Sequence, residues 1–175
     1  MPQLVLLNGP AGVGKSTLAR RYADAHPMTL ALEIDVVRAM LGSWLEESER
    51  SGPAARQLAL AVAAAHLEQG YDVIVPQLLT RREFVEELRT TTERAGARFR
   101  ELALMADRTV VLDRLSRREE PAGGFSARAL AAKQGHTPGS SYEPFAAALK
   151  ERPDAEVIDA ASLDDAYDEL VRLLG

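Results

Sequence analysis

A nine-residue segment near the N-terminus has the composition of a phosphate-binding loop. Residues 9–17 are Gly-Pro-Ala-Gly-Val-Gly-Lys-Ser-Thr, which fits the pattern G-x-x-x-x-G-K-[ST]. Glycines at these positions let backbone N–H groups surround phosphate oxygens. In this pattern the lysine reaches the β- and γ-phosphates and the hydroxyl after it ligates Mg²⁺. The sequence therefore predicts an ATP and Mg²⁺ site, with Ser16 on the metal and nucleotide contacts from Gly9, Ala11, Gly12, Val13, Gly14, Lys15, Ser16 and Thr17.

The segments on either side of this loop supply the structural context that the motif requires. Residues 3–8 form a short apolar run that is typical of a buried parallel strand, and residues 18–23 have the pattern of a helix. A strand, a glycine loop and a helix in this order distinguish a nucleotide site from a chance match. The alternative is a glycine-rich turn that binds nothing, and the adjacent lysine and serine weigh against it.

Asp35 lies where the second predicted strand ends and a helix begins. A hydroxyl that attacks a γ-phosphorus must be oriented and must lose its proton, and Mg²⁺ needs oxygen ligands. We predict Asp35 as the general base and, through water, as a magnesium ligand; a simple helix cap is the structural alternative. Arg38 follows three residues later on the same helical face and is predicted to bind the acceptor, with an ion pair to Glu33 or Asp35 as its alternative.

Three arginines precede a segment rich in glycine and proline. Arg114 and Arg118 are four residues apart and share a helical face, and Arg117 lies nearby. Phosphoryl transfer spreads negative charge over the equatorial oxygens, and arginines can stabilise that charge. We predict that Arg114 and Arg118 are catalytic and that Arg114 also contacts the nucleotide. A solvated basic face is the alternative.

Two further side chains are candidates for the acceptor site. The third predicted strand ends in Gln77, where a carboxylate would supply a second link to magnesium. An amide can hydrogen-bond a ligand but is a poor base, so Asp35 remains the main carboxylate candidate. Trp44 lies on the predicted helix that directly follows Asp35 and is a candidate wall of an acceptor pocket, although an apolar stripe at this spacing also suits plain core.

Strand-like and helix-like segments alternate along the chain. The predicted strands are residues 3–8, 29–34, 71–75, 99–104 and 155–158. The predicted helices are residues 18–23, 36–49, 53–69, 80–95, 107–118, 126–134 and a final one capped by Ser162, and the helix at 80–95 opens on a capping-box pattern at Thr80 and Glu83. This alternation indicates one α/β domain over residues 1–175, with a parallel sheet that has helices on both faces. Ligands in such sheets bind beyond the carboxyl ends of the strands.

The segment from residue 119 to about residue 143 is irregular. Pro121-Ala122-Gly123-Gly124 lies on one side of the predicted helix at 126–134, and residues 135–141 lie on the other. Glycine and proline at both ends are typical of hinges, so we predict a small helical lid at about residues 117–137.

Composition narrows the class of protein. The sequence has no cysteine, which excludes a disulfide framework and a thiolate metal site. A net charge of −5 disfavours a dedicated nucleic-acid binder, because nucleic acid is itself negatively charged. No apolar run approaches the length of a membrane span, and residues 1–8 lack the pattern of a signal peptide. We therefore expect a cytoplasmic protein without membrane contact, and the sequence leaves its oligomeric state open.

These residues together resemble the small P-loop kinases of the nucleoside-monophosphate-kinase-like group. Residues 34–38, Ile-Asp-Val-Val-Arg, resemble the Asp-x-x-Arg segment of polynucleotide 5′-kinases and adenylylsulfate kinases. Residues 73–76 and 104–106 resemble the tunicamycin-resistance ATP-binding protein, and residues 131–134 resemble both that family and chloramphenicol phosphotransferase. The resemblance implies a three-layer P-loop NTPase fold with a five-stranded parallel sheet in the order 2-3-1-4-5. It also implies Asp35 as general base, Arg38 as an acceptor contact and the arginines as part of a lid.

The sequence thus predicts an ATP- and Mg²⁺-dependent phosphotransferase that acts on a hydroxyl of a small molecule, such as an antibiotic or a metabolite. A polynucleotide or nucleotide kinase is a second hypothesis, which requires a basic track leading to Asp35. A non-catalytic, nucleotide-regulated protein that binds a drug or a partner is a third. No motif identifies the acceptor or distinguishes ATP from GTP.

Overall fold

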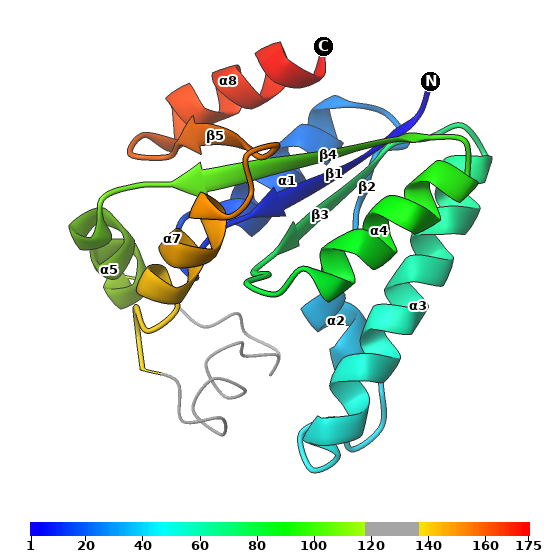
Figure 1. Ribbon diagram of the computed structural model, residues 1–175, viewed down its shortest axis with the longest axis horizontal. Helices are drawn as coiled ribbons and strands as arrows, with labels where there is room; N and C mark the ends of the chain where they lie inside the picture. The colour runs from blue at the N-terminus through cyan, green and yellow to red at the C-terminus, as the bar shows by residue number, and fades with distance from the viewer. Residues whose placement is uncertain (118–136) are drawn as a thin grey trace.

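The computed structural model of the chain describes residues 1–117 and 137–175, and its centre is a parallel sheet with helices on both faces (Figure 1). The strands are β1 (Gln3–Asn8), β2 (Leu30–Ala31), β3 (Val73–Gln77), β4 (Arg98–Met105) and β5 (Glu156–Asp159). The helices are α1 (Lys15–Ala25), α2 (Ile34–Ala39), α3 (Ser48–Glu68), α4 (Glu83–Arg94), α5 (Arg108–Arg117), α7 (Tyr142–Lys150) and α8 (Leu163–Leu174).

The five strands lie in the order β2-β3-β1-β4-β5, and all four neighbouring pairs are parallel. The predicted fold class and strand order are therefore confirmed. Strand β1 is central, and its last residue, Asn8, lies opposite Gln77 of β3 on one side and Ala103 of β4 on the other. The phosphate loop consequently begins in the middle of the sheet, at the carboxyl ends of the strands.

Each face of the sheet has its own core. Side chains of β1 alternate between the two faces, so Val5 and Leu7 belong to the core under α1 and α8, while Leu4 and Leu6 belong to the core under α3 and α4. All four are at most 2% exposed. Apolar strands buried on both faces are the expected sequence signature of a parallel sheet, and they hold the loop that follows β1 on a rigid base.

The region after β2 differs from the prediction. Strand β2 contains only two residues, and helix α2 begins at Ile34, so Asp35 lies in the first helical turn rather than at a strand end. The single helix predicted for residues 36–49 is also wrong, because α2 ends at Ala39. Ser43 has a positive φ of 52°, a conformation that cannot continue a right-handed helix. The chain therefore turns between α2 and α3.

Helix α3 begins five residues before the position predicted from Pro53. It starts at Ser48 and carries Pro53 inside it rather than near its first position. Helix α4 starts at Glu83, and its N-cap residue, Arg82, makes no side-chain capping bond, so the predicted capping box at Thr80 is wrong. The predicted cap of the last helix is confirmed, because the Ser162 hydroxyl accepts a hydrogen bond from the backbone N–H of Asp165 at 3.3 Å.

Strand β3 runs two residues further than predicted and contains Pro76. A proline is tolerated there because β2 pairs with β3 only as far as Ile74, so Pro76 has no β2 residue to which it would donate a hydrogen bond. Helix α7 was not predicted at all. Its sequence, YEPFAAALK, is short and has a proline in its first turn. Across the described residues, no helix is both long enough and apolar enough to span a membrane.

Candidate functional site

The loop after β1 has backbone conformations and close contacts that require glycine. Gly12 has φ of 87° and Gly14 has φ of 112°. A Cβ atom on Gly12 would lie 2.5 Å from Cγ of Leu115, and one on Gly14 would lie 2.4 Å from Cδ2 of Leu163. Helix α1 starts immediately afterwards at Lys15, so the loop leads directly into the N-terminus of an eleven-residue helix. This is the arrangement in which backbone N–H groups and the helix field act together on an anion.

Lys15 extends back over the loop that precedes it. Its Nζ donates hydrogen bonds to the carbonyl oxygens of Gly9 and Pro10, each at 2.9 Å. The side chain is half-buried. The structure therefore fixes the ammonium group at the loop, where its charge adds to the field of the α1 N-terminus.

Asp35 lies within electrostatic range of Lys15, although the two residues come from different elements. The pKa of Asp35 is raised from its ordinary value of 3.8, chiefly because burial disfavours the charged carboxylate. The positive charges of Arg38 and Lys15 act in the opposite direction, and the negative charge of Glu33 adds to the rise. A carboxylate with a raised pKa binds a proton more tightly than an exposed one, which suits a general base.

Ser16 and Asp35 are the two residues predicted to hold magnesium. Ser16 lies in the first turn of α1, next to Lys15, and its side chain is half-buried. A hydroxyl and a carboxylate are hard oxygen ligands, and Mg²⁺ commonly takes only one or two such groups from the protein and the rest from phosphates and water. The donor set therefore fits Mg²⁺.

Arg114 on α5 joins the phosphate loop to the segment after β5. Its guanidinium donates to the carbonyl oxygens of Val13 at 3.1 Å, Ala160 at 2.7 Å and Ala161 at 2.8 Å. The sequence prediction that Arg114 lies at the nucleotide loop therefore has a geometric basis. Arg117 points elsewhere: it forms an ion pair with Asp113 at 2.9 Å, and its side chain is 78% exposed. Arg118 and almost all of the predicted lid, including the helix predicted at 126–134, lie outside the described residues.

The acceptor-side candidates occupy two places. The guanidinium of Arg38 is buried: it donates to the Ser51 hydroxyl at 2.8 Å and to the Ser48 carbonyl oxygen at 2.6 Å, and it lies 5.8 Å from the centre of the Trp44 ring. The main contacts of Arg38 are therefore with Ser48 and Ser51, and not an ion pair with Glu33 or Asp35, which was the alternative drawn from the sequence. Gln77 is half-buried at the end of β3, beside the phosphate loop.

A buried polar chain next to the phosphate loop was missed in the sequence. Asn8, Glu101 and Arg152 are each less than 10% exposed, and hydrogen bonds link Asn8 to Glu101 at 2.8 Å and Glu101 to Arg152 at 2.6 Å. The sequence contained one signal of this polar chain, which is the position of Asn8 between an apolar strand and a glycine. Glu101 follows the alternating pattern of β4, and Arg152 lies in a segment to which no element was assigned.

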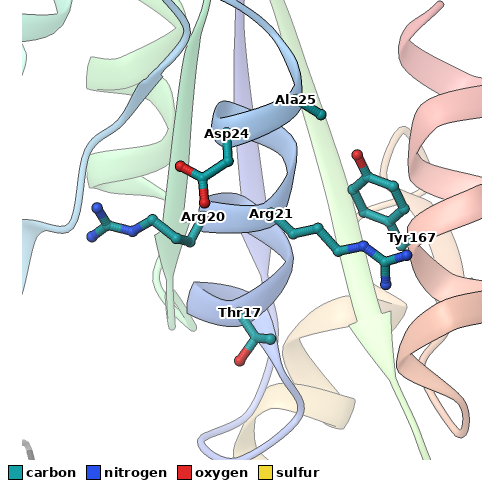
Figure 2. Close-up of a pocket in the computed structure, with 6 residues that line it drawn as sticks. All are labelled: Thr17, Arg20, Arg21, Asp24, Ala25 and Tyr167. Carbon is teal, nitrogen blue, oxygen red and sulfur yellow. The ribbon is translucent and has the colours of Figure 1, made fainter.

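A separate shallow hollow lies on the outer side of α1 (Figure 2). Its two arginines already have partners: Arg20 pairs with Glu33 at 3.2 Å, and Arg21 pairs with Asp164 at 2.6 Å. Arg21 also lies over the ring of Tyr167, 3.9 Å from its centre. Through these pairs Arg21 links α1 to α8, and Arg20 links α1 to the residue before α2. Thr17 of the phosphate loop lies at one end of the hollow.

A family model described as "AAA domain" matches residues 4–136, which include the phosphate loop, Asp35 and α5. The chain belongs to this AAA domain family. No curated protein sequence matches the chain.

Several solved structures share the fold over nearly the whole chain. A tunicamycin resistance protein from Deinococcus radiodurans is 20% identical, with 100% of this chain and 96% of that chain covered and a TM-score of 0.64. An APS kinase from Mycobacterium tuberculosis, solved with AMPPNP and APS, is 23% identical, with 99% and 97% covered and a TM-score of 0.67. A gluconokinase from Sinorhizobium meliloti 1021 is 20% identical, with 98% and 93% covered and a TM-score of 0.58. The predicted fold of the small P-loop kinases is thus confirmed.

Proposed function

We propose that this protein is an ATP- and Mg²⁺-dependent kinase that transfers the γ-phosphate to a hydroxyl of a small molecule. The observation that carries the proposal is that the phosphate loop and Asp35, which belong to different elements, lie near each other. A glycine loop with Lys15 leads into α1, and the half-buried carboxylate of Asp35, with its raised pKa, lies within electrostatic range of that lysine. A phosphate site beside a basic carboxylate is what phosphoryl transfer to a hydroxyl requires.

In this proposal the nucleotide is held by the loop and by α1. Backbone N–H groups of the loop and the N-terminus of α1 attract the phosphate oxygens, and Lys15 adds a positive charge. Ser16, with Asp35 through water, would hold Mg²⁺, which would neutralise charge on the phosphates. Arg114 contributes its guanidinium at the junction of the loop and the segment after β5.

The acceptor would lie between Asp35 and the phosphate loop. Asp35 orients the hydroxyl and takes its proton as the oxygen attacks phosphorus, while the bond from phosphorus to the β,γ-bridging oxygen breaks and ADP leaves. Arg38 and Trp44 at the α2–α3 corner, and Gln77 at the end of β3, are the proposed acceptor contacts. The gluconokinase and the APS kinase with the same fold show that this architecture serves acceptors of different chemistry.

A label-transfer assay tests the proposal. The protein is incubated with Mg²⁺ and ATP labelled in its γ-phosphate, together with aminoglycosides, phenicols, nucleosides and sugars, and labelled organic products are separated. We expect label in at least one acceptor with the wild-type protein and none with Lys15→Ala. Tight MgATP binding without transfer to any acceptor would instead favour a nucleotide-regulated binding protein, and label in a 5′-hydroxyl oligonucleotide would favour a polynucleotide kinase.

A further inference from the structure

The side chain of Asn8 joins the phosphate loop to the loop that follows β3, here called the post-β3 loop (residues 78–82). Its Oδ1 accepts hydrogen bonds from the backbone N–H of Gly9 at 3.0 Å and of Leu79 at 2.9 Å. Its Nδ2 donates to the carbonyl oxygen of Leu79 at 3.1 Å and to Oε1 of Glu101 at 2.8 Å. A primary amide has two donors and two acceptor sites, so every hydrogen-bonding position of this fully buried side chain is used.

Glu101 and Arg152 continue this chain of contacts behind Asn8. Their ion pair is 2.6 Å long, and their side chains are only 8% and 5% exposed. Arg152 also donates to the carbonyl oxygen of Arg81 at 3.3 Å, and Arg82 donates to the carbonyl oxygen of Glu151 at 2.8 Å. The post-β3 loop is thus fastened to β1 by Asn8 and to the segment after α7 by two further bonds.

Helix α7 connects the same network to the phosphate loop from the other side. The hydroxyl of Ser141, which precedes α7, accepts a hydrogen bond from the backbone N–H of Ala11 at 3.1 Å, and Tyr142 donates to the carbonyl oxygen of Ala106 at 2.9 Å. Nine helical residues cover about 13 Å. The helix lies beside the carboxyl ends of the central strands (Figure 1) and has the phosphate loop at one end and the Arg152 contacts just beyond the other.

We propose that Asn8, Glu101 and Arg152 are positioning residues, which hold the post-β3 loop in a fixed place relative to the phosphate loop. This inference rests on the proposed function, because the post-β3 loop follows Gln77 and borders the space assigned to the acceptor. A buried ion pair gains little stability over an apolar pair of similar volume, so stability alone is a weak reason for one here. The contacts instead end on backbone groups of two loops, and in this way they fix the distance between the nucleotide side and the acceptor side.

Hydrogen–deuterium exchange of the full chain tests this inference, with Mg²⁺ and the ATP analogue AMPPNP as the nucleotide. In the wild-type protein we expect the nucleotide to slow exchange in the post-β3 loop. In Asn8→Ala we expect Leu79 to exchange at least tenfold faster and the nucleotide to give no protection there, while the Kd for MgAMPPNP changes by less than about fivefold. The side chain of Asn8→Ser is too short for its hydroxyl to reach Leu79, so this variant should show the same changes in exchange as Asn8→Ala. It replaces Asn8→Ala in the experiment if the alanine variant does not fold.

Two control variants separate positioning from general loosening of the fold. Gln3→Ala removes a side-chain amide that donates to Asp72 at 3.3 Å at the opposite end of β1, and it should leave exchange of the post-β3 loop unchanged. Glu101→Gln keeps an acceptor oxygen for Asn8 and should retain the protection by nucleotide.

Several outcomes would overturn the inference. The first is that Leu79 exchanges at the wild-type rate in Asn8→Ala. The second is that Gln3→Ala accelerates the exchange of Leu79 as much as Asn8→Ala does. The third is that nucleotide still protects the post-β3 loop in both Asn8 variants. If the wild-type protein does not bind MgAMPPNP, the proposed function is wrong. The inferred coupling between the nucleotide and the post-β3 loop is then wrong as well. The two failures are distinguishable, because the difference at Leu79 in the absence of nucleotide reports on the Asn8 contacts alone.

Discussion

At the scale of single residues, the site depends on the balance of charges around Asp35. Burial raises the pKa of this carboxyl, and the positive charges of Lys15 and Arg38 reduce that rise. A basic carboxylate that is half-buried has an energetic cost in the folded protein, because ionisation is easier in the unfolded chain. We infer that function and stability are opposed at this position.

The variant Asp35→Asn should therefore be more stable than the wild-type protein at neutral pH. Because the folded-state pKa of Asp35 is raised, the wild-type protein loses stability as pH rises through that pKa, and the cost is absent below the ordinary value of 3.8. Urea unfolding at pH 7.5 should show a higher midpoint for the variant, and the difference should shrink as pH falls towards 4. If Asp35→Asn is less stable than the wild-type protein at pH 7.5, the predicted direction of the stability change is wrong.

Lys15→Met should weaken MgATP binding at least tenfold and leave the fold intact. The lysine is half-buried, and it donates hydrogen bonds to the carbonyl oxygens of Gly9 and Pro10 in the loop. Titration calorimetry with MgATP measures the loss. Arg50→Met is the matched control, because Arg50 is 85% exposed and pairs with Glu47 at the surface. The affinity of this variant for MgATP should equal that of the wild type.

The residues of the phosphate loop were predictable from sequence because their function requires particular residue types at fixed spacing. Asp35 was found as a carboxylate close to that loop, yet its raised pKa depends on burial, which the sequence does not encode locally. Glu101 and Arg152 were not predictable, because they lie 51 positions apart and meet only after the sheet and α7 have formed. Arg38 was assigned to the acceptor, and the structure shows that it also holds the start of α3 through Ser48 and Ser51.

At the scale of elements, the turn into α1 positions the chemistry. The loop is confined between α5 and the start of α8, because a Cβ atom on Gly12 would collide with Leu115 and one on Gly14 would collide with Leu163. Elements with strong periodicity or clear caps, such as β1, β4 and the start of α8, were predicted within one or two residues. The α2–α3 corner was predicted poorly, because a left-handed residue at Ser43 interrupts a pattern that is apolar at helical spacing on both sides.

Replacing Gly14 by alanine tests the confinement of the loop. The residue has φ of 112° and its Cβ would lie 2.4 Å from Leu163, so Gly14→Ala should lose about 1–3 kcal/mol of stability and most MgATP affinity. Gly96→Ala is the control: its φ is 70°, but nothing lies within 4 Å of its Cβ position. Urea unfolding should show a smaller loss for this variant, and calorimetry should show unchanged MgATP binding. Equal losses in both variants would mean that the Leu163 contact has no effect.

At the scale of the whole molecule, the parallel sheet brings the end of β1, the end of β3 and the start of α2 to one edge. The sequence predicted this architecture because apolar strands alternated with helices, and the resemblance to P-loop kinases implied the order of the strands. It could not predict how α7 joins the phosphate loop to the post-β3 loop, since those contacts involve backbone groups. Nothing in the sequence identifies the acceptor, because the acceptor contacts that we propose depend on the shape of the α2–α3 corner.

Nucleotide binding should stabilise the folded molecule as a whole. A ligand at one hundred times its Kd adds about 2.7 kcal/mol, which for a domain of this size is a rise in Tm of about 5–10 °C. Differential scanning fluorimetry with MgATP should show this rise in the wild-type protein and little in Lys15→Met. An unchanged Tm at millimolar MgATP would count against a nucleotide site.

The most direct test of the central claim is the rate of acceptor-stimulated ADP release by the wild-type protein and by Asp35→Asn at saturating MgATP. The acceptor is the panel compound that receives label in the transfer assay. If Asp35 is the base of a kinase, the wild-type protein releases ADP faster with the acceptor than without it, and Asp35→Asn loses this stimulation at least a hundredfold while its Kd for MgATP stays within about threefold. Equal stimulated rates in the two proteins, or no stimulation by any acceptor in the wild type, would contradict the account.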